Sequence, residues 1–271
     1  MHIPFDQLKA EFKRVLLKLN FTHERADFCA QIFAENSRDG VYTHGLNRFP
    51  AFVQHIKNGL INIDAQPTLI NNLGAIEQWD GNLAPGILNA SFCMDRAITL
   101  AEQNGIGCVA IKNTNHWMHG GTYGWQAADA GFIGICITNS IANMVPWGGS
   151  TNALGNNPLI IALPRADGHV VLDMAISQYS KGKVLQYQSF EDELPFVGGY
   201  DGDGNLTKDP NAIIESKRLL PIGLWKGSAL SMVLDMLVSA LSLGKTVKQI
   251  TDQGNESSAS QVFIAIKPFN A

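Results

Sequence analysis

The 271-residue sequence has little charge and few cysteines, and each scarcity excludes a class of protein. Asp, Glu, Lys and Arg supply only 16% of the residues, and a formal net charge of −4 leaves no basic excess for binding nucleic acid. The four cysteines include no C-x-x-C pair, so we expect reduced, buried thiols in a cytoplasmic protein. The most apolar stretch, residues 227–244, contains Asp235 and falls short of the roughly 20 clean residues that cross a membrane. Neither nucleic acid nor a membrane is an expected partner.

The common catalytic and cofactor motifs are also missing. No G-x-G-x-x-G follows a predicted strand, so a dinucleotide would not bind on an ordinary Rossmann turn. The G-x-S-x-G elbow of a serine hydrolase is absent. His116 and His119 have H-x-x-H spacing, and His44 could be added as a third ligand, but no H-E-x-x-H occurs and few acidic residues lie nearby. We therefore expect no metal site.

The spacing of apolar residues divides the chain into two parts. Residues 1–66 have helical periodicity over 5–20, from Thr22 to Gly40 and over 46–58, which predicts a small helical N-terminal domain. Pro50 is tolerated only in a first helical turn, so the third helix can begin as late as that residue.

Residues 67–271 have the alternation of a mixed α/β domain, in which short runs rich in Ile and Val are separated by helical patterns. The polar stretch 191–210 is predicted to be a surface loop. The expected strands cover 68–72, 75–80, 107–112, 133–139, 159–163, 169–174 and 261–267, and the expected helices cover 84–104, 122–130 and 226–243.

The segment VYTHGLNRFP, residues 41–50, combines two side chains that suit the reduction of a 2-oxo acid. The ordinary pKa of histidine, about 6.5, allows His44 to donate a proton near neutrality. Arg48 lies four residues later, one helical turn away, and its planar guanidinium matches a carboxylate. The spacing alone favours the other interpretation, a histidine that caps a turn and an arginine on a solvated face.

Two further stretches have residues that could contact a ligand. Residues 113–124, NTNHWMHGGTYG, follow a predicted strand, where loops of α/β sheets often form ligand crevices. Asn139 and Ser140 end another predicted strand and precede the glycine turns at 148–149 and 155. Both stretches are also compatible with glycine-rich turns that have only a structural role.

These stretches, together with much of the remaining chain, resemble the malate/L-lactate dehydrogenase family of the non-Rossmann type. The resemblance extends in order over nearly the whole sequence, which makes it far more specific than any short motif. It is carried by the segments VYTHGLNRFPAFVQHI, GAIEQWDG, NHWMHGGTYGWQAADAGFIGICITNS, VPWGG, GNNPLI, VLDMAISQYSKGK, DGDGNLTKDP and LPIGLWKGSALSMVLDML.

The resemblance implies a non-Rossmann nicotinamide-binding sheet domain, with residues 1–66 on the substrate side, and a homodimer whose active-site cleft uses both subunits. It would explain the missing glycine fingerprint. The implied catalytic residues are His44, as proton donor, and His116; Thr43 and Arg48 are the implied substrate-binding residues. The implied cofactor-binding residues are Asn139, Ser140, His169, Val170, Val171, Leu172, Asp173, Met174, Ala175, Trp225 and Lys226.

The implied cofactor is NAD, with NADH favoured over NADPH because no basic pair is evident near Asp173. Within the family, GAIEQWDG and NHWM resemble the branch that reduces 2,3-diketo-L-gulonate to 3-keto-L-gulonate. Malate, lactate, ureidoglycolate and cyclic imines are the alternative substrates, with His116 as the main base. Relatives usually have G-T-N-P where this chain has GNNP at 155–158, and they continue beyond the strand at 261–267, so we expect the C-terminal segment to be shortened.

Overall fold

A computed structural model describes residues 2–269, and its N-terminal part is a layer of helices. α1 (Phe5–Lys18), α2 (His23–Arg38) and α3 (Phe49–Lys57) match the three predicted helices, with the 3₁₀ turn η1 (Tyr42–His44) before α3. Thr22 caps α2 by accepting a hydrogen bond from the backbone N–H of Arg25, as an N-cap residue should. Pro50 lies in the first turn of α3, so that helix begins three residues later than the apolar pattern suggested. The buried faces form one aromatic-rich cluster that includes Phe12, Phe33, Phe49 and Phe52.

A seven-stranded sheet forms the larger part, in the order β1-β2-β3-β11-β4-β7-β8. All seven predicted strands are present. Only β2 and β3 pair in parallel, and every other neighbouring pair is antiparallel. β11 is the last strand in the sequence but lies at the centre of the sheet. The strands are β1 (Thr68–Leu73), β2 (Ile76–Asp80), β3 (Ile106–Thr114), β4 (Ile133–Thr138), β7 (Leu159–Leu163), β8 (Val170–Met174) and β11 (Ala259–Ile266).

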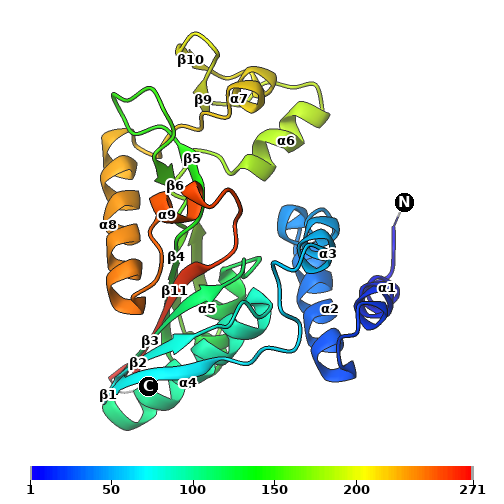
Figure 1. Ribbon diagram of the computed structural model, residues 1–271, viewed down its shortest axis with the longest axis vertical. Coiled ribbons are helices and arrows are strands. Elements are labelled where there is room, and N and C mark those ends of the chain that lie inside the picture. Colours follow the sequence, from blue (N-terminus) through cyan, green and yellow to red (C-terminus); the bar gives the residue numbers. More distant parts are fainter. Residues whose placement is uncertain (1, 270–271) are drawn as a thin grey trace.

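Helices cover both faces of the sheet, which explains why its central strands are almost continuously apolar. Val109 and Ile111 of β3 pack in a cluster with α4 (Gly86–Asn104) and α5 (Gly121–Asp129). The alternate residues Cys108 and Ala110 pack in a second cluster with α8 (Trp225–Ser242). Figure 1 shows α8 on one side of the sheet and the α1–α3 layer on the other.

Several short elements were not predicted. The expected loop at 191–210 contains the small hairpin β9 (Gly199–Tyr200) and β10 (Leu206–Thr207), flanked by α6 (Lys181–Ser189) and α7 (Pro210–Ser216). These elements form the lobe at the top of Figure 1. Val184 of α6 and Ile213 of α7 are buried in the cluster that also contains Leu234 and Val238 of α8, so tertiary packing stabilises helices too short to be stable alone. The remaining elements are β5 (Ala142–Met144), β6 (Leu154–Gly155) and α9 (Val247–Asp252).

None of the helices within residues 2–269 is long and apolar enough to span a membrane.

Candidate active site

His44 is held in η1 by polar side chains at the end of α2. The Asn36 amide donates to the backbone oxygen of His44 at 3.0 Å, and the Ser37 hydroxyl accepts from the N–H of Leu46 at 2.9 Å. A Cβ on Gly45 would lie 2.3 Å from that hydroxyl, so only glycine permits this close approach. The Thr43 hydroxyl lies 3.0 Å from Nδ1 of His44, which leaves Nε2 for a ligand.

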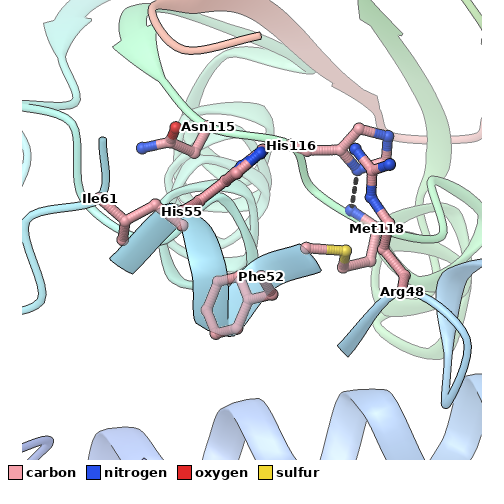
Figure 2. Close-up of a pocket in the computed structure, with 7 residues that line it drawn as sticks. All are labelled: Arg48, Phe52, His55, Ile61, Asn115, His116 and Met118. Carbon is pink, nitrogen blue, oxygen red and sulfur yellow. Dashed lines mark hydrogen bonds between the residues drawn. The ribbon is translucent and has the colours of Figure 1, made fainter. Parts of the chain in front are cut away.

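His116 comes from a different part of the fold, the loop that follows β3. The preceding residue, Asn115, anchors this loop by donating to the backbone oxygens of Leu83 and Ala84. The backbone N–H of Met118 donates to Nδ1 of His116 at 2.9 Å (Figure 2), so the neutral ring has its proton on Nε2. The rings of His44 and His116 stack with centroids 5.6 Å apart. The structure therefore brings the two predicted catalytic histidines together.

A third histidine, His119, joins this group through Asp173. Its Nε2 lies 3.1 Å from the carboxylate of Asp173 at the end of β8, which also accepts the backbone N–H of Gly121 at 2.7 Å. Sequence reasoning considered His119 only as a metal ligand and missed this pair. No group of three His, Cys, Asp or Glu side chains in residues 2–269 is arranged to hold a metal ion.

Arg48 lines a small pocket of about 10 Å³ between α3 and the loop after β3 (Figure 2). Arg48, Phe52 and His55 lie on one face of α3, because they are spaced by four and three residues. Nη2 of Arg48 donates to the carboxylate of Glu256 at 2.8 Å. His55 and Glu256 were not predicted, although the i, i+4, i+7 spacing was a readable signal for His55. The other lining residues are Ile61, Asn115, His116 and Met118.

Burial and the positive charge of Arg48 keep His44 and His116 neutral at pH 7. Burial, reinforced by the positive charge of Arg48, lowers the pKa of His44 to about 4. Burial and the same arginine hold the pKa of His116 well below its ordinary value. At pH 7 both imidazoles are therefore neutral in the absence of a bound ligand. For either ring to donate one, an arriving negative charge must first raise its pKa.

The predicted cofactor residues divide into several places. Asp173 lies beside the histidines, and its Oδ1 has no hydrogen-bond partner within residues 2–269, so it can accept from a hydroxyl such as that of a ribose. The other members of its strand, Val170, Val171, Leu172 and Met174, extend along the sheet edge, and Ala175 follows them. His169 lies at the opposite end of the strand and binds Asp129 at 2.9 Å.

The remaining cofactor candidates lie on the α8 side. Asn139 is buried and already satisfied, since its amide donates to Asp235 and to the backbone oxygen of Lys245 while its oxygen accepts from Ser260. The Ser140 hydroxyl accepts from the backbone N–H of Asn156. Trp225 and Lys226 begin α8, with the Trp225 side chain largely exposed. Of all these residues, Asp173 fits a nicotinamide dinucleotide best. It lies beside the histidine cluster, and one of its carboxylate oxygens has no partner within residues 2–269.

Comparisons with known proteins agree with this fold. A sequence model of a family described as malate/L-lactate dehydrogenase matches residues 3–271. A protein of Escherichia coli O1:K1 named 2,3-diketo-L-gulonate reductase is 51% identical over 268 residues, which are 98% of this chain and 80% of that protein.

Solved structures of other dehydrogenases have the same fold. A putative malate/lactate dehydrogenase from E. coli has a TM-score of 0.94 at 28% identity, covering 100% of this chain and 78% of its own. The sulfolactate dehydrogenase of Methanocaldococcus jannaschii has a TM-score of 0.89 at 31% identity, covering 99% of this chain and 78% of its own.

Proposed function

Because the chain belongs to the malate/L-lactate dehydrogenase family, whose members are oxidoreductases, we propose that it reduces 2,3-diketo-L-gulonate to 3-keto-L-gulonate with NADH. The observation that carries the proposal is that His44 stacks on His116, which lines one pocket with Arg48, although His116 comes from a different part of the fold. The substrate follows from the 51% identity to a protein named for this reaction.

In the proposed mechanism Arg48 binds the substrate carboxylate. Its Nη2 is paired with Glu256, while Nη1 and Nε have no partner within residues 2–269 and can form charge-assisted hydrogen bonds. This contact orients the C2 ketone toward the stacked histidines. It also places a negative charge beside the guanidinium that lowers the pKa of His44.

His44 then donates the proton to the C2 oxygen. Neutralisation of Arg48 by the substrate removes one cause of the low pKa, and the developing alkoxide raises it further, so His44 takes up a proton as the substrate binds. The Thr43 hydroxyl, 3.0 Å from Nδ1, orients the ring with Nε2 free for this transfer. His116 is the alternative acid–base group, through its protonated Nε2. A bound reduced nicotinamide supplies the hydride.

Asp173 is the residue we propose to hold the cofactor, through its free carboxylate oxygen and a ribose hydroxyl. NADH is the proposed donor because residues 166–180 contain no lysine or arginine to bind the additional phosphate of NADPH. We propose the same role for the other predicted cofactor residues. Two of them, Asn139 and His169, are already hydrogen bonded within the protein.

The exposed side of α8 supports the proposal of a homodimer. Met232, Val233 and Met236 are each more than half exposed and adjacent on that helix, which is an unusual accumulation of apolar surface. The four cysteines are all free and buried, which supports the proposal of a reducing, cytoplasmic location. We also propose that residues 1–66 form the substrate-side domain, since Arg48 and His44 both belong to it.

Loss of NADH absorbance in the near ultraviolet tests the proposed function directly. We expect turnover with 2,3-diketo-L-gulonate at a higher kcat/KM than with pyruvate, oxaloacetate, oxidised ureidoglycolate or a cyclic imine. A higher kcat/KM with one of these compounds would show that this compound is the preferred substrate, while the proposed reaction would still be a reduction by NADH. NADH binding without turnover of any of them would refute the reductase proposal.

A further inference from the structure

The contact between Arg48 and Glu256 joins two distant parts of the chain. Glu256 lies 208 residues after Arg48, in the segment between α9 and the central strand β11. Among the residues that the structure describes, only Nη2 of Arg48 donates to its carboxylate, so one edge of the guanidinium is occupied and the other remains available. Both side chains are about one-third exposed, which places the pair at the mouth of the pocket.

The segment that carries Glu256 is fixed by its own hydrogen bonds. The Gln253 amide donates to the backbone oxygens of Asn255 and Ser257, and the Asn255 side chain accepts from the backbone N–H of Ser257. Ser258 has a left-handed backbone with φ of 62°, after which the chain enters β11. Glu256 therefore occupies a defined position, and its contact with Arg48 is part of the folded framework.

We propose that Glu256 is a positioning residue for the reductase site, which holds the Arg48 guanidinium with its free edge available to the substrate carboxylate. This inference rests on the proposed function, in which Arg48 binds that carboxylate. A guanidinium held on one side loses less conformational freedom when it binds a ligand on the other. Glu256 also supplies a negative charge that balances the positive charge of Arg48. That positive charge acts on the imidazoles of His44, His55 and His116.

The charge balance follows from the groups around each histidine. His44 faces the positive charge of Arg48, the rings of His116 and His119, and the carboxylate of Asp173. His55 faces both Arg48, which lowers its pKa, and Glu256, which raises it. Without Glu256 the charge of Arg48 would act on His55 uncompensated, and the pKa of His55 would fall further.

Two substitutions separate the hydrogen bond from the charge. Glu256→Gln keeps an oxygen that can accept from Nη2 but removes the charge, whereas Glu256→Ala removes both. For Glu256→Ala we expect KM for the 2-oxo acid to rise about tenfold with kcat within about threefold of the parent. For Glu256→Gln we expect KM to change less than in Glu256→Ala. The basic limb of the kcat/KM profile should shift about 0.5–1 pH unit lower, because His44 must be protonated to donate.

A matched control is available in α9. Asp252→Asn removes the same charge four residues earlier, from an exposed pair with Lys248, and should leave KM and the pH profile unchanged. A fall in KM on removal of Glu256 would show that it competes with the substrate for Arg48, which overturns the proposal. An unchanged KM and pH profile in both Glu256 variants would also overturn it.

Titration of the histidine ring signals by NMR tests the inference without turnover. We expect the ring of His55 to titrate at lower pH in Glu256→Gln than in the parent and in Asp252→Asn. Identical titrations in all three proteins would overturn the inference. If the parent reduces no 2-oxo acid, the proposed function fails by itself, and the NMR comparison still decides whether Glu256 balances the charge of Arg48.

Discussion

Replacement of His44 by glutamine should remove both the proton donor and the uptake of a proton that accompanies substrate binding. With a pKa of about 4, His44 is protonated at pH 7 in roughly one molecule in a thousand. Half-protonation requires a rise of three units, or about 4 kcal/mol. One negative charge placed about 4 Å away supplies about 4 kcal/mol at an effective dielectric constant of about 20. A substrate carboxylate bound to Arg48, together with a developing alkoxide, is therefore sufficient to raise the pKa of His44 to about 7.

Oxamate, a 2-oxo acid analogue that is not reduced, isolates the binding step. Calorimetric titration of the NADH-loaded protein with oxamate at pH 7, in two buffers of different ionisation enthalpy, measures the number of protons taken up. Because oxamate brings the carboxylate but develops no alkoxide, we expect a measurable fraction of one proton per site for the parent and almost none for His44→Gln. In turnover with 2-oxo acid, kcat of the variant should fall about 10²–10⁴-fold while NADH binding is retained.

Two results would refute this reasoning. Equal proton uptake by the parent and by His44→Gln would show that another group, such as His116, receives the proton. Equal kcat for the two proteins would show that His44 is not the donor in the reduction.

Three other substitutions probe the binding site, the sheet and the α8 surface. Arg48→Met should raise KM for the 2-oxo acid about 10–150-fold with a smaller effect on kcat, because charge-assisted hydrogen bonds contribute about 1.5–3 kcal/mol; an unchanged KM would exclude the carboxylate contact. Glu77→Gln should lower the melting temperature at pH 7, since this buried carboxylate accepts from Arg96 and Trp79. Although burial acts to raise the pKa of Glu77, those bonds leave it below its ordinary value, so its contribution to stability is present at neutral pH and disappears as the pH falls through the folded pKa. The difference in melting temperature between parent and variant should therefore shrink below about pH 4, and a constant difference would contradict this. Met236→Lys on the exposed face of α8 should shift sedimentation from dimer toward monomer, and an unchanged mass would place the interface elsewhere.

The seven strands and the principal helices were predictable because their signals are local. A short, almost continuous run of apolar residues identifies a strand that is buried on both faces, as in β3 and β11. The helices α6, α7 and α9 were missed because they contain only six to nine residues, and packing against the α8 side stabilises them.

Part of the candidate site could be found in the same way. His44 and Arg48 belong to one short segment, and His116 lies within a stretch that the family resemblance covers. Glu256 could not be found, because nothing within its own segment indicates that it lies opposite Arg48. The pairing of His119 with Asp173 was missed because Asp173 comes from a strand 54 residues later.

The amino-acid sequence by itself determined the family and the helical and sheet regions, and it supplied His44, His116 and Arg48 as the proposed acid–base and carboxylate-binding side chains. Only the tertiary structure decided which charges surround them: it places β11 at the centre of the sheet and so brings the preceding segment, with Glu256, against α3. The physical reason is that periodicity reports the burial of each element separately, whereas pKa values and ion pairs depend on distances between elements. Those distances exist only once the chain has folded.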